Sequence, residues 1–190
     1  MPAFARLGRP ESGSRRADEP AGDSVRVRNE TSIAARIRRS IRNVDKTEAI
    51  AEFRADVSTE RFIDAWLDPV KVRLWMAEAL REMGLEGEMR VVEIDAKVGG
   101  RFLISDVRNG VETRHWGEYR QIRRPNRIEF KWITDPADEA DPSVVRMSMV
   151  DEGAGCVIRI VHEIDLKWSE FAPQIASSWE RMIRKAAEVA

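Results

Sequence analysis

The stretch from residue 115 to residue 132 constrains the fold more than any other part of this chain. It reads HWGEYRQIRRPNRIEFKW, two segments with apolar side chains at alternating positions, joined by a turn at Arg124-Pro125-Asn126-Arg127. Alternation with a period of two is typical of β-strands, and a short polar link that contains proline is typical of a turn. We therefore expect an antiparallel pair of strands here.

Further strands are predicted on both sides of this pair. Alternating apolar residues begin at Ala49, and again near Val92, Val145 and Ile158. Turn-forming residues separate these segments, at Gly99-Gly100, Asn109-Gly110 and Gly153-Ala154-Gly155. Asn-Gly between two strand patterns is among the strongest short-range signals of a hairpin. The pattern predicts about seven strands, joined mainly by hairpins.

Within residues 46–190, helices are predicted in two places. Ser58 or Thr59 can cap a short helix that runs to about Leu67, and Pro69 can begin a second one that runs to Met76. Near the C-terminus, apolar residues at helical spacing predict a long amphipathic helix, at Phe171, Ile175, Trp179, Met182, Ile183 and Ala186.

The expected fold class is α+β, a curved antiparallel sheet wrapped around the C-terminal helix, with the two short helices after the first strand. A helix of about 18 residues is ~27 Å long, which is close to the ~24 Å width of six paired strands. One helix can therefore lie across the concave face of the sheet. We assign this domain to residues 46–190.

Residues 1–45 have a different composition. Residues 1–30 are rich in Arg, Gly, Ser, Pro and acidic residues and have no periodic apolar pattern, which predicts disorder. In residues 31–44, isoleucine and valine form one helical stripe among arginines, which predicts a short basic amphipathic helix. This helix can contact an acidic protein partner, or it can be a solvated leader packed loosely on the domain. A start codon assigned too far upstream is a third interpretation.

Charge and cysteine content narrow the function classes. The formal net charge is -1 and the positive excess is confined to residues 24–46, so the chain as a whole does not resemble a nucleic-acid-binding protein. Cys156 is the only cysteine, which excludes an internal disulfide and a cysteine-based zinc site and fits a reducing cytosol. No apolar run approaches the ~20 residues of a membrane span. We therefore expect a cytoplasmic protein. We expect neither a cofactor nor a metal, because the usual phosphate-binding, nucleophile and zinc motifs are absent.

The order of several short motifs resembles that of the START-like (SRPBCC) superfamily. These motifs are Phe62-Ile63-Asp64-Ala65-Trp66-Leu67-Asp68-Pro69, Val98-Gly99-Gly100-Arg101-Phe102, Gly117-Glu118-Tyr119, Arg124 to Trp132, and Ser178-Trp179. Within the superfamily, residues 47–189 are most similar to the branch named for homology to the activator of Hsp90 ATPase. The resemblance implies a helix-grip fold with a cavity for an apolar or amphipathic small molecule between sheet and helix. The chain departs from many relatives at Ser178, where they carry glycine, and residues 1–45 show no sign of the separate N-terminal domain of the chaperone activator.

The candidate ligand-cavity residues are those whose predicted strand or helix face points toward this interior. They are Phe102, Trp116, Glu118, Trp132, Met147, Met149, His162, Trp179 and Met182. Aromatic and methionine side chains make adaptable apolar walls, but the same residues can simply fill a core. For Trp116, Trp132 and Trp179 both interpretations stay open, whereas Trp66 and Trp75 are expected to pack the short helices. A small-molecule site of this kind normally has a cavity of ~300 Å³ or more.

Strand parity also orients the polar candidates. His162 alternates with inward isoleucines, so we expect it inside, as a polar handle for a ligand or as a core histidine satisfied by its neighbours. In an unbroken strand His115 faces away from Trp116, and we expect His115 and Tyr119 outside and Glu118 inside.

The leading hypothesis is non-covalent binding of a small hydrophobic or amphipathic molecule, without an assigned catalytic residue. One alternative is a cyclase- or hydratase-type enzyme in which His162 and either Glu118 or Arg146 transfer protons. In the other interpretation of these two charged residues, they pair with neighbours on the surface. A second alternative is a chaperone-associated protein-interaction module.

Overall fold

A computed structural model of the chain describes residues 45–85 and 87–190. The predicted disorder of residues 1–30 and the predicted basic helix at 31–44 lie outside the described residues. All statements below concern the described part of the chain.

The core of the fold is one curved antiparallel sheet of seven strands in the order β1-β7-β6-β5-β4-β3-β2. The strands are β1 (Lys46–Ala55), β2 (Glu88–Ile94), β3 (Arg101–Arg108), β4 (Val111–Arg123), β5 (Arg127–Trp132), β6 (Ser143–Glu152) and β7 (Gly155–Asp165). Only β1 and β7, which are far apart in sequence, are paired without a direct connection, and this pairing brings the two ends of the domain together. The predicted α+β fold class is confirmed.

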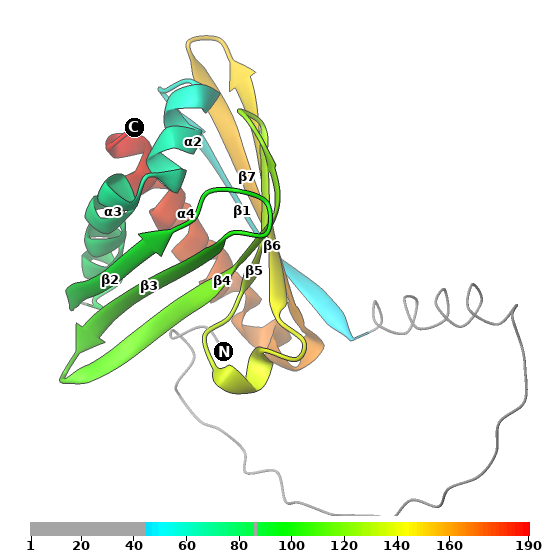
Figure 1. Ribbon diagram of the computed structural model, residues 1–190. Coiled ribbons are helices and arrows are strands. Elements are labelled where there is room, and N and C mark those ends of the chain that lie inside the picture. Colours follow the sequence, from blue (N-terminus) through cyan, green and yellow to red (C-terminus); the bar gives the residue numbers. More distant parts are fainter. Residues whose placement is uncertain (1–44, 86) are drawn as a thin grey trace, which may run out of the picture.

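Helices cover the concave side of this sheet, as Figure 1 shows. They are α2 (Thr59–Leu67), α3 (Pro69–Glu82) and α4 (Ala172–Glu188). Two short 3-10 helices lie in the connections, η1 (Pro136–Asp138) between β5 and β6 and η2 (Leu166–Phe171) between β7 and α4. The predicted caps are present: the Ser58 hydroxyl accepts from the backbone N–H of Arg61, and the Asp68 carboxylate accepts from Val70 and Lys71. The long helix α4 lies along the sheet, and α3 packs against both α4 and β2.

Two element boundaries differ from the sequence-based expectation. Helix α3 continues beyond Met76 to Glu82, because the additional residues are good helix formers and the chain turns only at Gly84, whose φ is +68°. Strand β2 ends at Ile94 rather than at Val98, which is 63% exposed. A tight turn replaces the end of that predicted strand, since a Cβ on Gly100 would lie 2.0 Å from the carbonyl oxygen of Asp95.

A β-bulge in β4 decides which side chains of this strand point inward. The register between β4 and β5 shifts between Tyr119 and Gln121, so the regular alternation of inward and outward side chains along β4 is interrupted there. Counting back from the inward Ile122 therefore gives the wrong face for every residue before the bulge. His115 and Tyr119 are buried, at 3% and 4% exposure, and the prediction that they face outward is wrong.

The two faces of the sheet differ in chemistry. The concave face carries the aromatic and aliphatic core, including Phe102, Phe130, Met147, Ile160 and, from the helices, Trp179. The convex face carries ion pairs between neighbouring strands, in which Arg146 binds both Glu129 and Glu163. The apolar core therefore lies on the concave side of the sheet.

Candidate functional site

The interior between the sheet and the helices is an aromatic layer. Trp132 of β5 and Trp179 of α4 meet edge to face with ring centroids 5.2 Å apart. Phe102 stacks on Trp132 at 5.8 Å, and Trp66 of α2 stacks on Trp75 of α3 at 4.8 Å. Aromatic pairs at these separations are favourable beyond their buried area. The layer joins all three helices to the sheet.

This layer leaves little empty space. The void inside it has a volume of about 20 Å³, which is room for about one water molecule. Its lining is apolar except for the edges of tryptophan and tyrosine side chains, and consists of Trp66, Val72, Trp75, Met76, Ile94, Phe102, Ile104, Tyr119, Phe130, Trp132 and Trp179. The prediction of a preformed cavity of ~300 Å³ is therefore wrong for the described residues. A ligand can enter this interior only if side chains or α3 move.

A second, larger space of about 180 Å³ lies at one end of the sheet, between η1 and η2. Its floor is formed by Trp132 and His162, so the same tryptophan borders this space and the inner void. We call this space the vestibule. Its walls are Lys46, Thr134, Ala137, Asp138, Ala140, Asp141, Ser143, Ile164, Asp165, Lys167 and Trp168.

His162 is held at the floor of the vestibule by a chain of hydrogen bonds. The indole N–H of Trp179 donates to Nδ1 of His162 over 3.1 Å. Nε2 of His162 lies 2.9 Å from the hydroxyl oxygen of Ser143, whose own hydrogen is donated over 2.7 Å to the carbonyl oxygen of Trp132. Because the Ser143 hydrogen is already used, His162 must donate from Nε2 and accept at Nδ1, which assigns the neutral Nε2–H tautomer.

This arrangement makes His162 a poor proton acceptor. Burial lowers the pKa of His162 to about 3, and both of its ring nitrogens are already engaged. Burial, with a smaller effect from nearby Arg108, also lowers the pKa of His115 to about 3. Neither histidine would carry a charge at neutral pH. Of the two interpretations of His162, the geometry favours the satisfied core histidine.

Trp116 and Glu118 do not line the interior, which corrects their predicted inward orientation. The bulge in β4 turns both toward the convex face, where Trp116 donates from its indole N–H to Glu139 over 3.2 Å. Glu118 accepts from the ammonium of Lys131 over 3.1 Å. Trp116 instead borders an open groove of about 640 Å³ on the convex side of β3 and β4, together with Leu103 and Pro136.

The other predicted cavity residues do point to the concave side. Phe102, Trp132 and Trp179 border the inner void, and His162 borders the vestibule. Met147, Met149 and Met182 are buried in the core and do not border either space.

The structure does not assemble the predicted proton-transfer group. His162 lies on the concave side, while Glu118 and Arg146 are engaged in ion pairs on the convex side. Among the described residues, no group of three or more His, Cys, Asp or Glu side chains is arranged to hold a metal ion. Burial raises the pKa of the Cys156 thiol, which disfavours the reactive thiolate.

Sequence reasoning missed several residues that border these spaces. Ser143 has the same strand parity as Val145 and Met147, so its inward position was available from the pattern. Tyr119 was misplaced by the bulge, and its burial raises the pKa of its phenol group. Trp66 and Trp75 do pack the short helices, but they also border the inner void.

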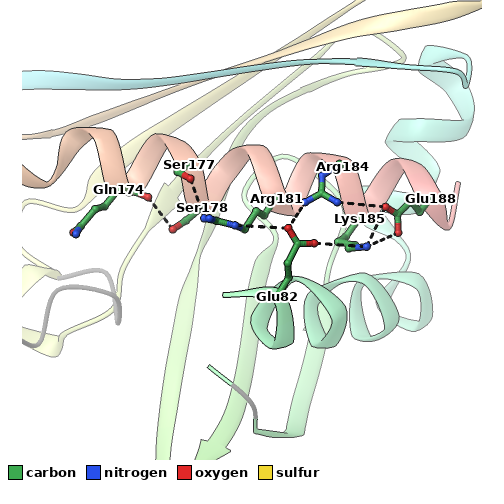
Figure 2. A network of polar contacts seen from close by, with 8 residues as sticks. All are labelled: Glu82, Gln174, Ser177, Ser178, Arg181, Arg184, Lys185 and Glu188. Carbon is green, nitrogen blue, oxygen red and sulfur yellow. Dashed lines mark hydrogen bonds and ion pairs between the residues drawn. The ribbon is translucent and has the colours of Figure 1, made fainter. Parts of the chain in front are cut away.

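The departure from glycine at Ser178 is accommodated locally. Ser178 is 7% exposed on α4, and its hydroxyl donates to the carbonyl oxygen of Gln174 over 2.9 Å, as Figure 2 shows. A bond of this kind within the helix satisfies the hydroxyl without a partner on the sheet.

The seven-stranded sheet gripping a long C-terminal helix defines a START-like protein. Residues 56–189 match the family model described as activator of Hsp90 ATPase homolog 1-like protein, and the chain belongs to this family. The resemblance read from the sequence is thereby confirmed. None of the curated proteins compared with the chain matches it.

Several solved structures share the fold. A protein from Chromobacterium violaceum is 18% identical, with 76% of this chain and 97% of that chain covered and a TM-score of 0.60. A protein of unknown function from Staphylococcus aureus is also 18% identical, with coverage of 76% and 93% and a TM-score of 0.60. An AHSA1-like protein from Aeromonas hydrophila is 18% identical, with coverage of 75% and 91% and a TM-score of 0.59. At these identities the likeness supports the fold alone.

In the described residues no helix is long and apolar enough to cross a membrane.

Proposed function

We propose that the protein binds a small apolar or amphipathic molecule between the sheet and α4. The observation that carries this proposal is that Trp132 borders both the vestibule and the inner void. We infer that movement of the Trp132 indole opens a route from the polar vestibule to the aromatic interior. Membership of a family with the helix-grip fold supports the same proposal.

The aromatic interior suits an adaptable site better than a rigid one. The elements that line the void differ in how firmly they are held. The central strands are paired on both sides. Strand β2 is an edge strand, and its Ile94 is only half-buried. Met76 of α3 adds a flexible side chain to the same wall. We infer that a ligand opens the interior on the side of α3 and β2.

Binding is tested by titrating the full chain with the uncharged probe N-phenyl-1-naphthylamine and following its fluorescence. Replacing Ile94 by Phe adds bulk beside the void and is expected to weaken binding about tenfold, because overfilling a packed interior is unfavourable. Ile50→Phe is the matched control, since Ile50 is 42% exposed on β1, and this variant should bind as the unchanged chain does. Equal binding by all three proteins, or no binding by any, would contradict the proposal.

Native mass spectrometry of the protein purified from its own cells gives a second, independent test. We expect a retained small molecule that is lost on denaturation and is depleted in Ile94→Phe. This measurement would also identify the ligand.

A second candidate function is docking of a protein on the convex groove beside Trp116. A half-buried tryptophan in a groove of about 640 Å³ favours it, because partly exposed tryptophans often anchor protein interfaces. The family description names an activator of the Hsp90 ATPase, so the test is stimulation of Hsp90 ATPase activity by the chain. Trp116→Ala should abolish any stimulation if this groove is the docking site.

A further inference from the structure

Three buried side chains that border the inner void carry a hydrogen-bond donor without a partner in the described part of the chain. They are Trp66, Tyr119 and Trp132, whose exposed fractions are 6%, 4% and 7%. Neither the indole N–H groups of the two tryptophans nor the Tyr119 hydroxyl makes a hydrogen bond to a described residue. Buried polar groups normally have a partner, and water or a ligand supplies it where the protein does not.

The other two tryptophans that border the void have used their donors. Trp75 donates to the carbonyl oxygen of Ala65 over 3.0 Å, and Trp179 donates to Nδ1 of His162 over 3.1 Å. Burial raises the pKa of the Tyr119 phenol, so its hydroxyl keeps its hydrogen at neutral pH. The unused donors are therefore a property of particular residues of this lining and not of its tryptophans in general.

The same lining is poor in acceptors and has no charged residue. An indole N–H can only donate, and Tyr119 carries the one side-chain oxygen among the residues that border the void. A ligand with an acceptor oxygen would pair these donors, whereas a hydrocarbon would leave them without a partner. A charged group would find no opposite charge in the lining to offset its loss of hydration.

We propose that the interior takes a neutral, largely apolar molecule with an acceptor oxygen, such as a ketone or an ether, and that this oxygen receives a hydrogen bond from Trp66, Tyr119 or Trp132. This inference rests on the proposed function, because it assigns the chemical class of the same ligand. The three donor residues determine specificity, and the other aromatic side chains of the lining supply apolar contact area.

The test compares two rigid probes with the same skeleton, 9-fluorenone and fluorene, of which only fluorenone carries a carbonyl oxygen. Equilibrium dialysis against the full chain at pH 7 gives both dissociation constants. Cyclohexane has no hydrogen-bond donor, so the ratio of the two water-to-cyclohexane partition coefficients is the reference for a site without donors. We expect the affinity of fluorenone relative to fluorene to exceed this reference at least about fivefold, the value of one ordinary hydrogen bond. A ratio equal to the reference would overturn the inference.

Three variants locate the donor: Trp66→Phe, Tyr119→Phe and Trp132→Phe. Each removes one donor and keeps an aromatic ring, so the affinity of fluorenone relative to fluorene should fall about fivefold in at least one of them. Trp75→Phe is the matched control, because Trp75 borders the same void and its N–H is already used. A relative affinity that is unchanged in all three donor variants, or that falls equally in Trp75→Phe, would contradict the assignment.

Thermal unfolding of ligand-free Tyr119→Phe gives a readout that does not depend on the probes. The hydroxyl has no partner among the described residues, so its removal should not lower the unfolding temperature. A clear decrease would mean that the hydroxyl is satisfied without a ligand, and would overturn its assignment as a donor. If neither fluorenone nor fluorene binds while N-phenyl-1-naphthylamine does, the inference fails alone; if that probe also fails, the proposed function fails with it.

Discussion

Two polar networks hold α4 in place, and they differ in their surroundings. One is the chain from Trp179 through His162 to Ser143, where every group is neutral; its bond between Trp179 and His162 is buried, and its contact between His162 and Ser143 is part-buried beside the vestibule. The other is the exposed network of Figure 2, where Glu82 of α3 binds Arg181, Arg184 and Lys185 of α4. Water replaces a broken bond in the second network but not the buried bond between Trp179 and His162 in the first. The buried chain should therefore dominate stability, and the exposed network should matter mainly for local opening of α3.

The largest expected effect is the loss of stability when acid protonates the buried histidines. Both buried histidines have pKa values lowered from 6.5 to about 3, so between these values the unfolded chain binds more protons than the folded one. Their contribution to stability is complete above pH 6.5 and is lost as the pH falls toward 3. Between pH 7 and pH 5 we expect a loss of about 4 kcal/mol for the two together.

Urea unfolding at several pH values measures this loss. Carboxyl groups such as Asp165, whose pKa is lowered from 3.8 by its contacts with Lys167 against the opposing effect of burial, lose their stabilisation only at lower pH and do not interfere in this window. His162→Asn should show about half of the slope, because only one buried histidine then remains. A stability that stays constant from pH 7 to pH 5 would contradict the assigned neutral state.

The next effect tests the same chain by mutation. His162→Leu removes the acceptor for the Trp179 indole N–H and leaves a buried donor unsatisfied, which we expect to cost about 3 kcal/mol of unfolding free energy. Trp179→Phe removes that donor. In the double variant, the loss of unfolding free energy should be about 1 kcal/mol smaller than the sum of the losses in the two single variants. The reason is that the indole donor, which His162→Leu leaves unsatisfied, is absent from the double variant. Additive losses in urea unfolding would mean that the bond between these residues does not stabilise the fold.

The sequence predicted the fold well because alternation, turn residues and helix caps are local signals. Asn109-Gly110 illustrates this: both residues have positive φ, 50° and 76°, as the hairpin turn requires. The face of β4 was harder to predict, because the bulge near Tyr119 depends on pairing with β5 and interrupts the alternation along the strand.

One residue in β4 does carry a signal for the correct face. Gly117 lies where an added Cβ would be 1.9 Å from the carbonyl oxygen of Lys131 and 2.8 Å from the Phe102 ring. A glycine flanked by larger residues in a strand indicates a close approach, and the close approach here is on the inward side. The size of the inner void was beyond the sequence, since it depends on how the aromatic rings of separate elements interlock.

The smallest expected effect lies on the exposed side of the comparison and concerns Glu82. The hydrogen bond from Arg184 holds the pKa of Glu82 below its usual value, with further contributions from the charges of Arg184 and Lys185. Glu82→Gln keeps the shape but removes the charge, so it should lower the unfolding temperature by less than about 3 °C. The change should instead appear as faster hydrogen exchange in the last turn of α3, where the contact with α4 is made. Salt screens such contacts, so the difference between the variant and the unchanged chain should vanish at about 1 M NaCl.

Glu78→Gln is the matched control, because Glu78 pairs with Arg81 inside α3 and does not reach α4. An exchange pattern that is the same in both variants would mean that Glu82 does not fasten α3 to α4.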